Sequence, residues 1–125
     1  MTHNSVDRPP TLILSPYRGH TYINTDYAKA CMKDSLSRGE APFASHLLYP
    51  QLLDDSTESE RTIGFECEKA WLAAAATSNC AAVVAVYVDR GVSEGMLETL
   101  NLAISRYRYK LKIEFRKLPS EGESI

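Results

Sequence analysis

Four short polar segments carry the residue types that could bind a small molecule, and each follows an apolar run or precedes a helical pattern. They are Ser15-Pro16-Tyr17-Arg18-Gly19, Ser45-His46, Asp89-Arg90 and Ser93-Glu94-Gly95-Met96. In an open α/β sheet, ligands bind outside the carboxyl ends of the strands, at the switch point between the two halves. If the apolar runs form parallel strands, the four segments converge on one ligand site.

The segment from Ser93 to Met96 is typical of a helix start that binds an anion. The free backbone N–H groups of a first helical turn and the Ser93 hydroxyl donate hydrogen bonds, and the helix dipole favours a phosphate. Gly95 leaves room for close approach to the backbone, and Arg18 can donate two parallel hydrogen bonds to the same anion. The alternative is that Ser93 serves only as the N-cap of the helix.

Three further side chains would recognise other parts of a ligand. His46 would hydrogen-bond a hydroxyl or a phosphate, Asp89 would hydrogen-bond a ribose hydroxyl, and Tyr17 would stack on a base or orient a carboxylate. The alternatives are a structural histidine at position 46 and a hydrophobic lid residue at position 17. No second histidine or cysteine stands at a ligand spacing, so we predict no metal site and no cofactor. The absence of G-x-S-x-G, Walker and G-x-G-x-x-G motifs argues against a serine hydrolase, an ATPase and a dinucleotide oxidoreductase.

The composition is that of one ordinary globular domain. The chain has 125 residues, of which 44% are hydrophobic and 24% charged, and its formal net charge is −2. It lacks the clustered lysines and arginines that nucleic-acid binding requires, and its longest apolar run, 81–88, is too short to span a bilayer. No apolar leader occurs at the amino end, so we expect a cytoplasmic protein with no nucleic-acid or membrane partner. The cysteines, at 31, 67 and 80, are odd in number and lack a C-x-x-C spacing, which indicates reduced thiols.

Strand and helix patterns alternate along the chain. The predicted strands are 11–14, 41–48, 81–88 and 110–118, and the predicted helices are 24–38, 57–77 and a third that Ser93 caps. This order predicts an α/β fold, a small doubly wound (Rossmann- or flavodoxin-like) parallel sheet of about four strands flanked by three helices. We expect a single domain at 11–118, between a flexible arm, 1–10, and a flexible tail, 119–125.

Periodicity predicts how these elements pack. The run 81–88 has no polar alternation, which is typical of a central strand covered on both faces, whereas 110–118 alternates as a half-exposed edge strand does. Thr57 and Glu60 have the spacing of a capping box, and Gly39 would end the first helix. The helical period predicts two packed faces, Ile63-Cys67-Ala70-Trp71-Ala74 in the second helix and Leu97-Leu100-Asn101-Ile104 in the third.

Four sequence motifs together resemble the nucleoside 2-deoxyribosyltransferase-like superfamily, and most closely a branch of small bacterial and phage proteins. They are SPYRG (15–19), PFASHLL (42–48), LLDD (52–55) and DRGVSEGM (89–96). The resemblance covers residues 11–118 and depends on the order and placement of the motifs. It implies a pocket for a nucleoside or nucleotide, completed by a neighbouring subunit in a homodimer or higher homo-oligomer.

The resemblance also implies residue roles. In catalytic members a glutamate on the helix after the glycine segment attacks the anomeric carbon, an aspartate assists the departing base, and a tyrosine near the first strand positions the nucleophile. The residues that match the family pattern in kind and place are Tyr17, Arg18, Gly19, Ser93, Gly95 and Met96. The position of the glutamate holds Thr99, and Glu98 stands one residue earlier, about 100° away around the helix. In place of the aspartate, the second helix offers Glu66 and Glu68.

Three hypotheses follow from this pattern. The first, which the misplaced glutamate favours, is a protein that binds a nucleotide or a nucleotide-derived small molecule; in a phage, it would sequester a host nucleotide signal in the host cytoplasm. The alternative is an N-glycosidase or deoxyribosyltransferase that cleaves the N-glycosidic bond of a nucleoside or its monophosphate, with Glu98 as nucleophile and Tyr17 orienting it. The third is an interaction protein that uses the alanine-rich second helix as a packing face.

Overall fold

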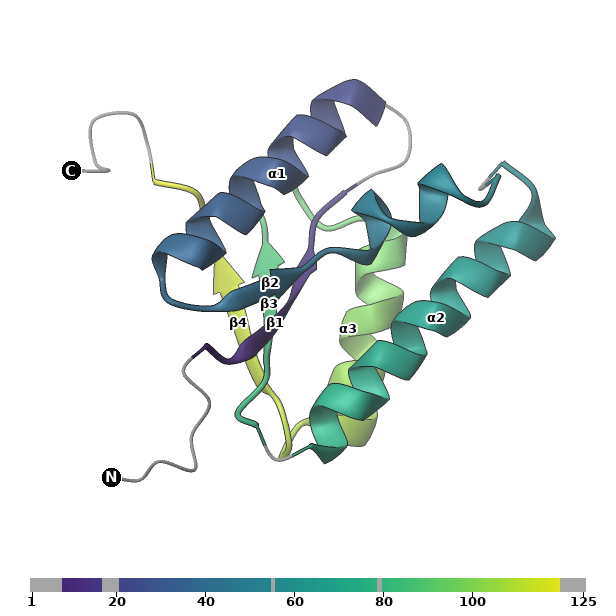
Figure 1. Cartoon of the computed structure of the whole chain (residues 1–125). Coiled ribbons are helices and arrows are strands. Elements are labelled where there is room, and N and C mark those ends of the chain that lie inside the picture. Colours follow the sequence, from purple (N-terminus) through teal and green to yellow (C-terminus); the bar gives the residue numbers. More distant parts are fainter. Residues whose placement is uncertain (1–7, 17–20, 55, 79, 120–125) are drawn as a thin grey trace, which may run out of the picture.

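A parallel sheet of four strands in the order β2-β1-β3-β4 forms the centre of the fold. The computed structural model describes residues 8–16, 21–54, 56–78 and 80–119. The strands are β1 (Pro10–Leu14), β2 (Ala41–Phe43), β3 (Val83–Tyr87) and β4 (Lys112–Arg116), and the helices are α1 (Thr21–Ser37), α2 (Glu58–Thr77) and α3 (Glu94–Tyr107). Helix α1 covers one face of the sheet, and α2 and α3 cover the other (Figure 1). The predicted α/β class is confirmed.

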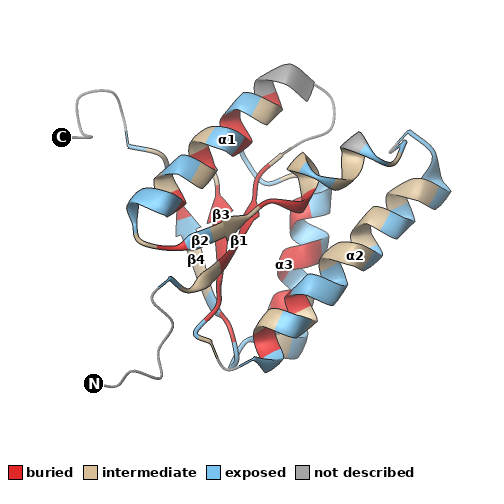
Figure 2. Ribbon diagram, viewed as in Figure 1, coloured by how far each residue is buried: buried red, intermediate tan, exposed pale blue. Residues whose placement is uncertain are grey.

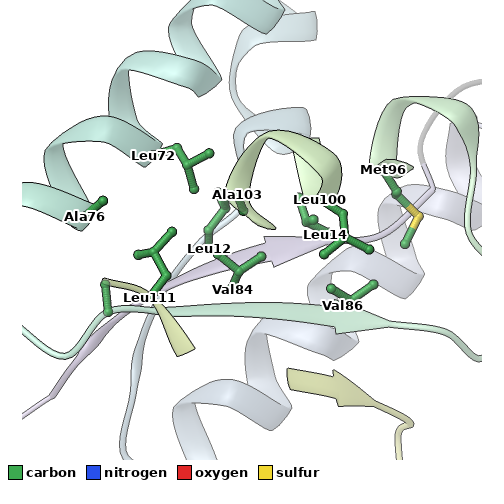
Figure 3. Packing of buried hydrophobic residues seen from close by; sticks show 11 residues of the cluster. Leu12, Leu14, Leu72, Ala76, Val84, Val86, Met96, Leu100, Ala103 and Leu111 are labelled. Atoms are coloured by element: carbon green, nitrogen blue, oxygen red, sulfur yellow. The ribbon is translucent and has the colours of Figure 1, made fainter. Parts of the chain in front are cut away.

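Each face of the sheet has its own hydrophobic cluster, because successive side chains of a strand point to opposite faces. On the α2–α3 face, Leu14 and Val86 of the sheet form one cluster with helical residues such as Leu72 and Leu100 (Figure 3). On the α1 face, Ile13 and its neighbours pack against residues of α1. All five residues of β3 are consequently buried (Figure 2), as predicted for a central strand.

The second predicted strand is wrong over most of its length. Strand β2 ends at Phe43, and two 3₁₀ helices follow it, η1 (Ser45–Leu47) and η2 (Tyr49–Gln51). The backbone N–H groups of Leu47 and Leu48 turn back to Ala44 and Ser45 and leave the ladder of the sheet. Proline at the start of η2 lacks the N–H that a continued strand would need. The consequence for the site is that Ser45 and His46 lie on a turn.

The packed faces of both later helices also differ from the predicted ones. In α2 the buried residues are Leu72 and Ala76, whereas Ile63 and Trp71 are 46% and 53% exposed. In α3 the buried residues are Met96, Thr99, Leu100 and Ala103, and of the predicted stripe Leu100 alone is buried. Hydrophobicity alone therefore selects the wrong side of each helix.

The helix boundaries follow their local signals more closely. Thr57 caps α2 by accepting the backbone N–H of Glu60, as predicted, although the Glu60 carboxylate accepts the N–H of Asp54 instead of completing the box. Helix α1 begins at Thr21, earlier than predicted, and is followed by Gly39 at φ +84°, the left-handed conformation that glycine tolerates. All three cysteines are free thiols.

The edge strand β4 reverses the expected exposure at its end. Phe115 is 59% exposed, whereas Arg116 is 5% exposed. Arg116 is held inside by Glu40, with distances of 2.8 Å from Nη1 to Oε1 and 2.5 Å from Nη2 to Oε2. The burial along β4 therefore does not alternate as predicted, because a buried ion pair covers Arg116 whereas Phe115 stays exposed.

Candidate ligand-binding site

A cavity of about 660 Å³ opens at the carboxyl ends of β1 and β2, between the two 3₁₀ helices and the first turns of α2 and α3. This volume is typical of small-molecule sites. The predicted site residues that line the cavity are Ser15, His46, Ser93, Glu94, Gly95, Met96 and Glu98. The structure thus brings together three of the four polar segments, at the sheet edge where open α/β folds bind ligands.

The remaining segment, Asp89-Arg90, does not reach the described lining of the cavity. The Asp89 carboxylate accepts hydrogen bonds from the Tyr27 hydroxyl at 2.7 Å and from the backbone N–H of Leu118 at 3.1 Å. It therefore joins α1 to the segment after β4. Pro16, at the end of the described part of its loop, is not among the lining residues. The predicted site residues Tyr17, Arg18 and Gly19 lie outside the described residues.

The start of α3 forms one wall of the cavity. Ser93 caps this helix, since its Oγ accepts the backbone N–H of Met96 at 3.3 Å, so the N-cap role is confirmed. A Cβ added at Gly95 would meet no described protein atom within 4 Å, so packing within the described chain does not require glycine there. Glu98 is exposed on the cavity side, off the packed face as predicted, and Thr99 is 1% exposed.

Ser15 and His46 form a close pair at the end of β1. The Ser15 Oγ lies 2.7 Å from the His46 Nε2, and either atom can be the donor, depending on the tautomer. Burial lowers the pKa of His46 to about 4, because desolvation disfavours the imidazolium. The imidazole is therefore neutral at pH 7. It suits a hydroxyl group of a ligand and lacks the positive charge that would favour a phosphate.

Glu68 is the most firmly positioned carboxylate of the cavity lining. It projects from α2, and its two oxygens accept hydrogen bonds from the hydroxyls of Ser45 in η1 and Thr99 in α3. Three elements from distant parts of the sequence thus fix one carboxylate in the cavity. Thr99 occupies the position at which the family resemblance implies a glutamate, so a carboxylate from α2 reaches the side chain at that position.

The described lining is acidic. Its charged side chains are the carboxylates of Glu58, Glu60, Glu68, Glu94 and Glu98 and the guanidinium of Arg61. A free phosphate would meet like charge over most of this surface, whereas hydroxyl groups of a ligand would find acceptors. The part of the cavity that the structure describes therefore suits the uncharged, hydrogen-bond-donating part of a ligand.

Sequence reasoning named Glu66 and Glu68 together and did not single out Glu68, because it placed the packed face of α2 on the wrong side. The inward stripe runs through Arg61, Phe65, Glu68, Leu72 and Ala76, at steps of three or four residues. Two of its five members are charged, so hydrophobic periodicity does not reveal it. The signal that could have found it is the same period, followed upstream from the buried Leu72 and Ala76.

Residues 9–115 match the family model of a domain of unknown function, DUF7768. The chain belongs to this family. The matched segment includes β1, β2 and β3, β4 as far as Phe115, and every described residue that lines the cavity. The site is therefore part of the DUF7768 domain itself. No curated protein and no solved structure matches the chain.

Within the described ranges, no three His, Cys, Asp or Glu side chains are placed to hold a metal ion together. None of the helices in the same ranges has the length and apolar character needed to cross a bilayer.

Proposed function

We propose that this DUF7768 domain binds a nucleoside, a nucleotide or a small molecule derived from one in the cavity at the carboxyl ends of β1 and β2. The cavity has the volume of a small-molecule site and combines polar and apolar walls. Leu14, Leu53 and Phe65 offer apolar surface to the flat face of a base, and the polar groups of the lining offer partners to a sugar. The start of α3 supplies backbone N–H groups for the remaining polar part of the ligand.

The observation that carries the proposal is the convergence of Ser15–His46 and Glu68 on one cavity. Ser15 and His46 are 31 positions apart, and Glu68 is hydrogen-bonded by a residue 31 positions later, so each contact depends on the tertiary fold. Groups held in this way are preorganised, and binding does not have to fix their rotamers.

The direct test measures the melting temperature of the purified chain with ribonucleosides, nucleoside monophosphates, cyclic nucleotides and ADP-ribose, each at millimolar concentration. A ligand at 100 times its Kd raises the free energy of unfolding by about 2.7 kcal/mol, which is readily detected. The variant Ser15→Val, which removes the hydroxyl from the cavity wall, should weaken the shift. A matched control is Ser105→Val on the exposed side of α3, which should leave it unchanged. If no compound in the panel shifts the melting temperature, the proposed function is wrong.

A second candidate function is cleavage of an N-glycosidic bond, which the position of Glu98 at the cavity wall favours. In that reaction a Glu98 oxygen bonds to the anomeric carbon while the N-glycosidic bond breaks. The electron pair leaves with the base, which takes up a proton from solvent. Water or a second base then displaces the carboxylate and gives up a proton. Free base released by the wild type but not by Glu98→Gln would support this function. Intact ligand recovered after denaturation would support the binding protein.

We further propose that the chain acts as a homo-oligomer in the cytoplasm. The outer face of α2 carries exposed apolar side chains, among them Ile63 and Trp71, which a second copy would cover. If the chain is encoded by a phage, the retained ligand would be a host nucleotide signal in the host cytoplasm. Light scattering of the wild type and of Trp71→Glu tests the oligomer, because a charge in the interface should lower the measured mass.

A further inference from the structure

We infer that Glu68 recognises the sugar of the ligand and that this sugar carries two adjacent hydroxyl groups, as ribose does and 2-deoxyribose does not. The inference rests on the proposed nucleoside-type site and specifies its substrate class. It makes Glu68 the specificity-determining residue of the cavity.

The first step is the fixed orientation of the Glu68 carboxylate. One oxygen accepts the Ser45 hydroxyl and the other accepts the Thr99 hydroxyl, and Thr99 is 1% exposed. Because the two donors come from η1 and α3, they hold the carboxylate from two sides and limit its rotation. The group is therefore preorganised, and a ligand does not have to order it.

The second step is the hydrogen-bonding capacity that remains. A carboxylate oxygen accepts about two hydrogen bonds, and within the described chain each Glu68 oxygen receives one. One acceptor site is left on each of the two oxygens, which are bonded to the same carbon. The Ser45 and Thr99 hydroxyls also keep acceptor lone pairs, since their hydrogens point to Glu68. The cluster thus presents acceptors to the cavity and needs a ligand with paired donors.

The third step is the chemistry that supplies such a pair. Two vicinal hydroxyls donate two nearly parallel hydrogen bonds, and a carboxylate that binds a ribose hydroxyl is the usual means of sugar recognition in dinucleotide-binding α/β folds. The neighbouring Ser15–His46 pair is neutral at pH 7 and offers a further hydrogen-bonding partner for a hydroxyl group of the ligand. A free phosphate at this position would be repelled by Glu68 itself and by Glu98 on the same cavity.

An organic cation would also satisfy paired acceptors, but it would leave most of the site unused. The Ser15–His46 pair lines the same cavity and offers neutral hydrogen-bonding partners that match the hydroxyl groups of a sugar. The apolar wall that includes Phe65 lies along the same cavity and can cover the face of a base. A sugar joined to a base uses both surfaces at once.

The test compares calorimetric affinities of the four common ribonucleosides with those of the matching 2′-deoxyribonucleosides. We expect the wild type to bind the preferred ribonucleoside about 10- to 100-fold more tightly than its 2′-deoxy counterpart, since a hydrogen bond to a charged group is lost. Glu68→Gln should reduce this ratio to within about threefold by weakening the ribonucleoside. The control Glu66→Gln, on the exposed side of the same helix and outside the cavity, should keep the wild-type ratio.

A second variant separates recognition from folding. Thr99→Val removes one hydroxyl that orients the carboxylate but retains Glu68, so it should lower the ratio only partly, with a melting temperature measured alongside. Equal affinity for ribo- and 2′-deoxyribonucleosides in the wild type, or an unchanged ratio in Glu68→Gln, overturns the sugar assignment while leaving the nucleoside site intact. Tight binding of agmatine that depends on Glu68, without ribose discrimination, overturns it in favour of a cation. If neither the nucleosides nor the nucleotides of the melting-temperature panel bind, the proposed function is overturned as well.

Discussion

Replacing Arg116 by methionine should destabilise the fold far more than replacing an exposed arginine. Arg116 is 5% exposed and Glu40 is 8% exposed, and the guanidinium donates to both Glu40 oxygens. It also donates to Glu114 through Nε at 2.7 Å and to the Tyr87 hydroxyl at 3.2 Å. In Arg116→Met, the Glu40 carboxylate would keep only the hydrogen bond from the Ser35 hydroxyl among those in the described chain. Leaving a buried charge without its partner costs about 3–5 kcal/mol.

The measurement is urea unfolding at pH 7, followed by far-UV circular dichroism. The matched control is Arg38→Met, which breaks a pair with Asp34 whose arginine side chain is 40% exposed, and it should cost about 0.3–0.5 kcal/mol. The double variant Arg116→Met, Glu40→Met removes both charges and should recover most of the loss. The reasoning is refuted if Arg116→Met costs no more than Arg38→Met, or if the double variant is less stable than Arg116→Met alone.

Three further predictions concern pH and the cavity wall. Burial by itself would raise the pKa of Glu40, but the hydrogen bonds from Arg116 and Ser35 outweigh burial and lower the pKa. The ionised carboxylate therefore stabilises the fold above the unfolded pKa of 4.5, and this stability is lost as the pH falls through the folded pKa. Unfolding curves of Glu40→Gln should show a smaller loss of stability in acid. Burial lowers the pKa of His46 to about 4, so this histidine takes up a proton at higher pH in the unfolded chain than in the folded one. The free energy of unfolding should therefore fall between pH 6.5 and 4, by at most about 1.4 kcal/mol per pH unit. Unfolding curves of His46→Gln should lack this decrease. Gly95→Ala meets open space within the described chain and should raise stability by about 0.4–1 kcal/mol, while the added methyl group weakens ligand binding at the start of α3; unchanged affinity would contradict a ligand at that backbone.

Short-range patterns predicted the elements well, because each depends on neighbours in the chain. The unbroken apolar run at β3 predicted a strand covered on both faces, and all five of its residues are buried. The caps at Thr57 and Ser93 were also correct, since a cap is a hydrogen bond between residues three positions apart. The fold class followed from the order of these elements.

The same patterns failed where an apolar run was not a strand and where a helix had two plausible faces. The run after Phe43 turns into 3₁₀ helices, because backbone hydrogen bonds within the run replace those of the sheet. Helix α2 has apolar residues on several sides, and only contact with the sheet and α3 selects Leu72 and Ala76 as its buried residues. Periodicity gives the spacing of a buried stripe but not its angle around the helix.

The sequence by itself determined the α/β class, the helix caps and the polar segments at the strand ends, since all of these are local properties of the chain. Only the tertiary structure decided that Glu68 meets Ser45 and Thr99 and that Arg116 meets Glu40, 76 positions away. These contacts depend on how helices rotate and strands order in three dimensions. A charged residue at an inward position is stabilised by partners from other elements, and no local sequence pattern predicts which residues these partners are.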